Sequence, residues 1–88
     1  MKLKKDFVLR EVAGSHIVLA TGAATLDFDG MLSLNESGAL LWRTLENGAD
    51  KDTLTEALMK EYEVGREQAS ADVDAFITNL TNAGCLEI

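Results

Sequence analysis

The stretch SLNESGALLW, residues 33–42, marks a change in the pattern of this sequence. Up to Leu34 apolar residues alternate with others, as they do along a β-strand with one buried face. Asn35 is a residue type that commonly caps the start of a helix. After it the apolar spacing becomes helical, at i, i+3, i+4 and i+7, in Gly38, Leu41, Trp42 and Leu45. The stretch therefore predicts the end of an N-terminal sheet and the start of a helical half.

Gly38 falls in the first turn of the predicted helix. Glycine is less favourable than alanine in a helix by about 1 kcal/mol. A residue without a Cβ allows another part of the chain to approach closely. We expect that neighbour to be the sheet or the third helix of the same chain rather than a ligand.

Four short runs with strand-like composition lead into this stretch, and they are FVLREV (7–12), HIVLA (16–20), TLDF (25–28) and MLSL (31–34). The first two are separated by a connection of hairpin length. The last two are separated by Asp29 and Gly30, a two-residue hairpin signal. The N-terminal part is therefore predicted to form an antiparallel sheet of three or four short strands.

Two more helices are predicted after the first. The run TLTE at 53–56 matches a capping box, in which Thr53 caps the helix and Glu56 reaches back to the cap. A third helix is expected over 67–83, and Gly84 follows it at a position typical of a C-cap. Strands followed by helices indicate an α+β fold. Three short helices before the extended tail CLEI also resemble a winged helix.

The size and composition indicate one small domain, 1–88, in the cytoplasm. A chain of 88 residues encloses one modest core. No segment approaches the roughly 18 apolar residues of a membrane span, and the start of the chain has no apolar run typical of a signal peptide. A single cysteine, Cys85, cannot form an internal disulfide, which is typical of a reducing compartment.

Catalysis by this chain alone is not expected, because the residue types that enzymes use stand isolated. The one histidine, His16, lies within a predicted strand, where histidine is far more often structural than catalytic. Cys85 has no lysine or arginine near it in the sequence to lower its pKa, which favours a small buried hydrophobe. Asp27 and Asp29 flank a turn and are typical of turn chemistry. We therefore expect no catalytic residue, no metal site and no cofactor.

The acidic character of the chain, with a net charge of −7, argues against nucleic-acid binding. A winged helix would place a late helix in the major groove. The helix predicted at 67–83 has no lysine or arginine, and it carries Glu67, Asp72 and Asp74. The phosphates that flank the groove would repel it. A winged-helix nucleic-acid-binding or regulatory protein stays as the alternative function.

Peptide binding is the remaining class. If the run 31–34 forms an edge of the sheet, its unpaired N–H and C=O groups can be satisfied by the strand of a partner. With the third helix beside it, the two would frame an apolar groove. Two possibilities stay open here: the edge receives a partner strand, or the tail of the chain itself covers it.

The helical half resembles the PqqD-like family, small proteins related to the pyrroloquinoline quinone biosynthesis chaperone. The family pattern joins a strand ending in Leu-Asn-Glu-Ser/Thr to a helix with a central aromatic residue or isoleucine. A T-x-x-E helix start follows, and then D-V-x-x-F-(L/I)-x-x-L-x-x-x-G-x-(L/I). The matching residues are Leu34 to Ser37, Trp42, Thr53, Glu56, Asp72, Val73, Phe76, Ile77, Leu80, Gly84 and Leu86.

The resemblance implies a winged-helix-like domain in which a three-stranded sheet is followed by three helices. It also implies a non-enzymatic adaptor or chaperone that holds the leader of a ribosomally made precursor peptide. The leader would lie as an added strand between the third strand and the third helix, and the adaptor would present the precursor to a modifying enzyme. The implied binding residues are Met31, Leu32, Ser33, Leu34, Val73, Asp74, Ile77 and Leu80.

Two departures from the family pattern point away from the quinone pathway itself. The segment 21–30 is longer than the tight second hairpin of the quinone-pathway members. The third helix begins with Val64, Gly65 and Arg66 where relatives often carry proline. The resemblance implies a radical S-adenosylmethionine (SAM) enzyme, or another peptide-modifying enzyme, as the partner, and the two departures indicate that it belongs to a different peptide-modification cluster.

Overall fold

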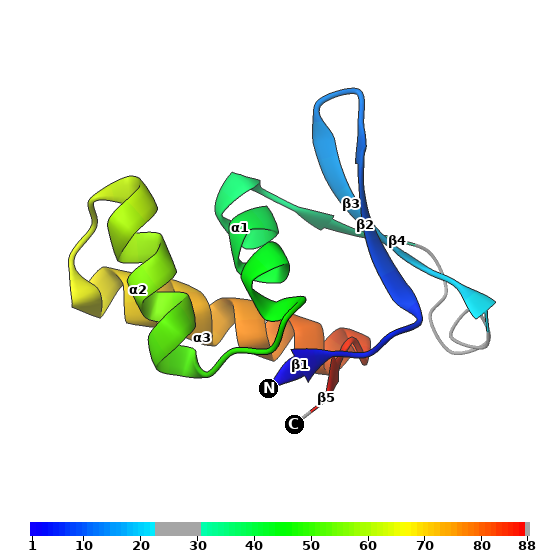
Figure 1. Cartoon of the computed structure of the whole chain (residues 1–88). Helices are drawn as coiled ribbons and strands as arrows, with labels where there is room; N and C mark the ends of the chain where they lie inside the picture. Colours follow the sequence, from blue (N-terminus) through cyan, green and yellow to red (C-terminus); the bar gives the residue numbers. More distant parts are fainter. Residues whose placement is uncertain (23–30, 88) are drawn as a thin grey trace.

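Three strands form the N-terminal sheet of the computed structural model, which describes residues 1–22 and 31–87 (Figure 1). They are antiparallel in the order β2-β3-β4, with β2 at Phe7–Val12, β3 at Ser15–Ala20 and β4 at Met31–Leu34. These three predicted strands are confirmed. The strand predicted at 25–28 lies outside the described residues.

The two ends of the chain pair with each other in a second, two-stranded sheet (Figure 1). Strand β1 (Lys2–Leu3) runs antiparallel to β5 (Leu86–Glu87), and the amide of Lys4 donates to the carbonyl of Cys85 at 2.9 Å. The predicted extended tail is confirmed, and it pairs with the start of the chain rather than with β4. Sequence reasoning does not find β1, because two residues are too short to carry a periodic signal.

Helix α1 (Glu36–Leu45) begins where the sequence predicts it. Asn35 is its N-cap, and Asn35 Oδ1 accepts a hydrogen bond from the Gly38 amide at 2.8 Å. A Cβ built on Gly38 would lie 3.1 Å from Asn35 Oδ1 and 3.3 Å from the Cβ of Leu34. Of the two neighbours expected for this glycine, the sheet supplies the close contact through Leu34, and no atom of the third helix is among the three nearest.

Helix α2 (Lys51–Tyr62) begins about one turn before the predicted capping box. Its N-cap is Asp50, whose Oδ1 accepts a hydrogen bond from the Thr53 amide at 2.8 Å. Thr53 is therefore inside the first turn, and the capping-box prediction is wrong. Aspartate and threonine are both favoured cap residues. Capping at Asp50 satisfies the Thr53 amide and lengthens the helix, so the earlier of the two signals decides the start.

Helix α3 (Arg66–Ala83) is confirmed to within one residue of its predicted start. Gly84 ends it with a φ of 78°, a left-handed conformation that glycine adopts without strain. Among the residues that the structure describes, no helix is both long enough and apolar enough to cross a membrane.

The hydrophobic core lies between the three helices and one face of the sheet. The largest of its fully buried side chains are Val18, Leu41, Trp42, Leu45, Leu54, Leu58, Val73 and Leu80. Cys85 is buried with them, and burial raises the pKa of its thiol although the charge of Lys4 opposes this. The expected character of Cys85 as a small buried hydrophobe is confirmed. Tyr62 stays outside this core, with 41% of its surface exposed.

Replacing Asp50 by alanine is expected to destabilise the fold at neutral pH and to have little effect in acid. Hydrogen bonds from Thr53, first of all from its backbone amide, hold the pKa of the Asp50 carboxyl below its usual value of 3.8. Because the folded-state pKa is the lower one, the carboxylate stabilises the fold above a pH of about 4. This contribution is lost as the pH falls through the folded-state pKa.

Urea unfolding of the wild type and of Asp50→Ala at pH 7 and at pH values below the folded-state pKa measures this effect. The gap between the two unfolding midpoints should close as the pH falls. The control is Asp52→Ala, which removes a neighbouring exposed acid that is not the N-cap. A gap for Asp50→Ala that stays constant with pH would contradict the capping role of the carboxylate.

Candidate functional site

Strand β4 forms an edge of the three-stranded sheet in the part of the chain that the structure describes. It pairs with β3 on one side, so that Leu32 lies opposite Val18 and Ser33 lies opposite Ile17. In an antiparallel pair, alternate residues point their N–H and C=O groups to the neighbouring strand, and the others point outward. Within residues 1–22 and 31–87 no strand pairs with the outward groups of β4, and an edge of this kind can accept another strand.

A groove runs beside β4, bounded by the start of α1 and by α3. It is a hollow of about 300 Å³ lined by Ser33, Leu34, Asn35, Ser37, Gly38, Leu41, Asp72, Ala75, Phe76 and Asn79. The residues from α3 follow the spacing i, i+3, i+4 and i+7, which places them on one face of the helix. The predicted juxtaposition of 31–34 with the third helix is therefore present in the structure.

Gly38 takes part in this geometry. A side chain at that position would press on Leu34 and Asn35, and both of these residues line the groove. Asn35 is held by two local hydrogen bonds, because its Oδ1 also accepts from the hydroxyl of Ser37 at 3.0 Å. The junction between β4 and α1 is thus a compact turn that forms one end of the groove.

The structure places the four helix residues predicted for the site elsewhere. Val73 and Leu80 are fully buried in the core, so their side chains present no surface to a partner. Asp74 forms an ion pair with Lys51 of α2, with 2.8 Å between Nζ and Oδ1. Ile77 is half-buried against the core, and it lies three residues after Asp74, on the same side of the helix.

The residues of α3 that do line the groove are Asp72, Ala75, Phe76 and Asn79. Sequence reasoning missed their role, because the apolar stripe of an amphipathic helix identifies the residues that the core requires. Phe76 belongs to that stripe and is 7% exposed, so it contacts both the core and the groove. The other three are exposed residues beside the stripe. Only their spacing at i, i+3 and i+7, which places them on one face of the helix, could have identified them as a group.

The β4 side of the prediction fits the structure better. Leu32 and Leu34 are half-buried against the core, and Ser33 between them is exposed. Ser33 and Leu34 line the groove directly. Met31 pairs with Leu19 at the start of the strand. The end of β4 therefore lies directly beside the groove.

The groove has an acidic and polar character. Asp72 is exposed, and its carboxylate accepts a hydrogen bond from the side-chain amide of Gln68 at 2.9 Å. No lysine or arginine stands among the residues that line the groove. A cationic side chain of a ligand would therefore meet a complementary charge.

The other chemical candidates form no site in the described residues. His16 is half-buried, and its Nδ1 is buried without a hydrogen-bond partner in the described part of the chain. Within the same residues, no three histidine, cysteine or acidic side chains are grouped so that they could hold a metal ion. Asp27 and Asp29 lie outside residues 1–22 and 31–87.

Comparison with known proteins agrees with this geometry. The model of the family described as "Coenzyme PQQ synthesis protein D (PqqD)" matches residues 16–86. Among solved structures, the chain is similar to that of "TbiB1 in Complex with the TbiA(beta) Leader Peptide", with 25% sequence identity and a TM-score of 0.80 over 99% of this chain and 95% of the other. No protein with curated annotation matches it significantly.

A second similar structure is "Lasso peptide synthetase B1 complexed with the leader peptide". It has 24% sequence identity and a TM-score of 0.75, and the match covers 96% of this chain and 93% of the other. The two likenesses extend over almost the whole chain, so they include the sheet and the helices.

Proposed function

The chain belongs to the PqqD family, whose model spans most of its length, and from this premise we propose that it is a peptide-binding adaptor. The family membership confirms the resemblance seen in the sequence. The α+β arrangement of an antiparallel sheet followed by three helices is confirmed as well. The prediction that the chain is not an enzyme is confirmed by its family and by its similarity to leader-peptide binding proteins.

The adaptor binds the leader of a ribosomally made precursor peptide by strand addition to β4. One observation carries this proposal: a strand edge with outward-facing backbone groups lies directly beside a groove of about 300 Å³. Backbone pairing would supply affinity, and alternate side chains of the peptide would enter the groove and supply specificity. The likeness to TbiB1, which was solved in complex with a leader peptide, supports a leader peptide as the ligand.

The contacts in this proposal come from the backbone of 31–34 and from the face of α3 that lines the groove. This groove face of α3 consists of Asp72, Ala75, Phe76 and Asn79. Asp72 is the acidic residue that this face presents to the groove, while Asp74 is paired with Lys51. A lysine or arginine of the leader would meet Asp72. Exposed pairs of this kind contribute only about 0–1 kcal/mol, so Asp72 would bias the choice of peptide without dominating the affinity.

The adaptor would present the bound precursor to a modifying enzyme, and a radical SAM enzyme is the partner class that the sequence resemblance implied. We further propose that 1–88 acts as one peptide-recognition domain, because one hydrophobic cluster joins residues from both sheets and all three helices. Its place is the cytoplasm, where a free thiol such as that of Cys85 stays reduced. No metal or cofactor of its own is required for this role.

Amide chemical shifts of the isotope-labelled chain test the proposal. The probes are synthetic peptides that cover the N-terminal halves of short precursor-like reading frames encoded beside the gene. We expect the largest shift changes at 31–34 and around Asp72, Ala75 and Asn79, because these residues border the groove. The matched comparison within the same spectra is the exposed face of α2.

Two outcomes would contradict the proposal. Shift changes that leave both 31–34 and the groove face of α3 untouched would place the binding site elsewhere. Turnover of any peptide by the purified chain alone would show that it is more than an adaptor.

A further inference from the structure

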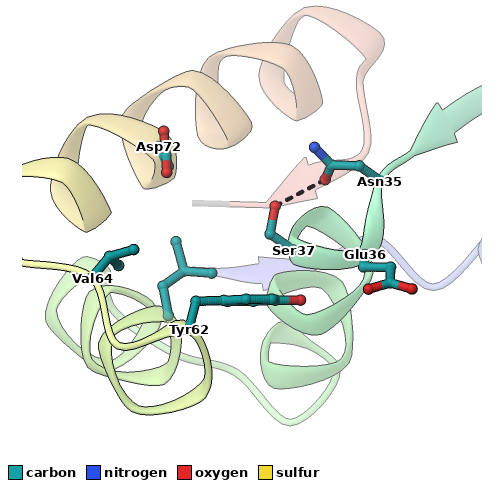
Figure 2. Close-up of a pocket in the computed structure, with 7 residues that line it drawn as sticks. Asn35, Glu36, Ser37, Tyr62, Val64 and Asp72 are labelled. Atoms are coloured by element: carbon teal, nitrogen blue, oxygen red, sulfur yellow. Dashed lines mark hydrogen bonds between the residues drawn. The ribbon is translucent and has the colours of Figure 1, made fainter.

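A second hollow, of about 370 Å³, lies at the meeting point of α1, α2 and α3 (Figure 2). It is lined by Asn35, Glu36, Ser37, Leu58, Tyr62, Val64 and Asp72. These residues come from the start of α1, the end of α2, the connection to α3 and the first half of α3. Leu58, Tyr62 and Val64 make most of its exposed surface apolar.

This hollow continues the groove beside β4. Asn35, Ser37 and Asp72 line both of them. Since Asn35 follows directly after the last residue of β4, the second hollow lies just beyond the end of the strand edge. A peptide that pairs with β4 would therefore reach it by continuing past Leu34.

The lining of the second hollow has two chemical parts. Tyr62 extends from α2 across it toward the start of α1 (Figure 2), and it forms an apolar wall together with Val64 and the buried Leu58. Glu36 and Asp72 contribute exposed carboxylates, and no lysine or arginine is part of the lining. An apolar wall with acidic groups beside it matches an apolar side chain next to a cationic one.

Tyr62 lies outside the buried core, whereas Val64 is half-buried and packs against it. Tyr62 is 41% exposed, and it is one of two large hydrophobic residues that are exposed among those described. The described part of the tail pairs with the start of the chain, as β5 with β1, and none of its residues lines this hollow. Exposed apolar patches framed by polar residues commonly mark binding sites.

We infer, building on the proposed function, that the second hollow is an anchor site for one large apolar or aromatic side chain of the leader peptide. A lysine or arginine adjacent to that anchor would meet Asp72 or Glu36. The leader would thus be recognised by two linked features: strand pairing along β4, and an anchor with a basic neighbour at the end of the strand next to Leu34.

Selection from a library of randomised short peptides, displayed on their own messenger RNA, tests this inference. The immobilised wild-type chain should enrich peptides that combine a large apolar or aromatic residue with a neighbouring lysine or arginine. The tightest of these peptides is then measured by fluorescence anisotropy against Val64→Arg and Tyr62→Ala. Val12→Arg is the matched control, because Val12 is a 55% exposed valine on β2, outside both hollows.

We expect Val64→Arg and Tyr62→Ala to weaken binding by at least about tenfold, as truncation of a binding hot spot does. Val12→Arg should change it by less than about twofold, as most residues outside a hot spot do. A peptide whose anchor residue is replaced by alanine should have the same weak affinity for the wild type and for Val64→Arg. The change in the peptide and the change in the protein remove the same contact, so their effects should not add. Circular dichroism with thermal unfolding shows whether each variant remains folded.

The outcomes separate this inference from the proposed function. If the wild-type chain enriches no peptide, the adaptor role itself is wrong. If it enriches peptides that bind Val64→Arg and Tyr62→Ala as tightly as the wild type, the adaptor role stands and the anchor site is wrong. Tyr62→Ala decides the question if Val64→Arg fails to fold, because the exposed Tyr62 side chain can be truncated without opening the core.

Discussion

An Ala75→Arg variant is expected to lose peptide binding while it keeps the fold. Ala75 is exposed in the middle of α3 and lines the groove beside β4. Arginine is a good helix former, so the helix should persist. Its long side chain would occupy space that the peptide requires, and its charge would neutralise Asp72 one turn earlier. We expect the affinity to fall by more than about 30-fold, which corresponds to roughly 2 kcal/mol.

The matched control is Thr81→Arg, which places the same side chain on the same helix at an exposed position outside the groove. A third variant, Ala75→Glu, fills the same space with the opposite charge. If steric exclusion dominates, Ala75→Glu should lose binding as Ala75→Arg does. Anisotropy titrations with one labelled leader peptide compare all three. Wild-type affinity in Ala75→Arg would show that the peptide does not enter this groove.

A Trp42→Ala variant is expected to produce the largest loss of stability. Trp42 is 1% exposed and is the largest fully buried side chain. Removing a buried aromatic side chain costs about 3–5 kcal/mol, because the transfer free energy is lost and a cavity remains. A domain of this length has a total stability of roughly 4–13 kcal/mol, so the change removes a large part of it. The unfolding midpoint in urea should fall sharply, or the variant should be unfolded in buffer.

Two further substitutions test whether the loss of stability in Trp42→Ala comes from the loss of its buried side chain. Trp42→Phe keeps most of the buried apolar surface and should cost much less than Trp42→Ala. Val12→Ala shortens a residue that is 55% exposed, and it should change the free energy of unfolding by less than about 0.5 kcal/mol. If Trp42→Ala lowers the free energy of unfolding only slightly, the core does not depend on Trp42 of α1. That result would contradict the role that its burial indicates.

The sequence predicts the elements of this fold well where local signals are strong. Asn35 starts α1 because an asparagine side chain satisfies an amide of the first turn. Gly84 ends α3 because glycine adopts a left-handed conformation without strain. The start of α2 shows the limit of such signals. Asp50 and Thr53 are both good cap residues, and only the folded chain decides between them.

The candidate site was also predictable from the sequence only in part. Strand alternation in 31–34 and its position before α1 are properties of the sequence itself, and they locate the strand. The pairing order β2-β3-β4 then makes this strand an edge among the described residues. The apolar residues Val73, Phe76 and Leu80 recur at helical spacing, so the sequence also places them on one face of α3. What a stripe cannot show is which of its two flanks lies beside β4, because helical periodicity is the same on either side.

The tertiary structure decides that question. The flank with Asp72, Ala75 and Asn79 borders β4, while Asp74 on the other flank pairs with Lys51 of α2. The sequence by itself therefore determined strands β2, β3 and β4 and the helices except for the start of α2, since each depends on local or periodic interactions, and its residue pattern also indicated the family. Only packing determined the face of α3 in the groove, the exposure of Tyr62 and the pairing of the two chain ends, because these depend on contacts between segments far apart in the chain.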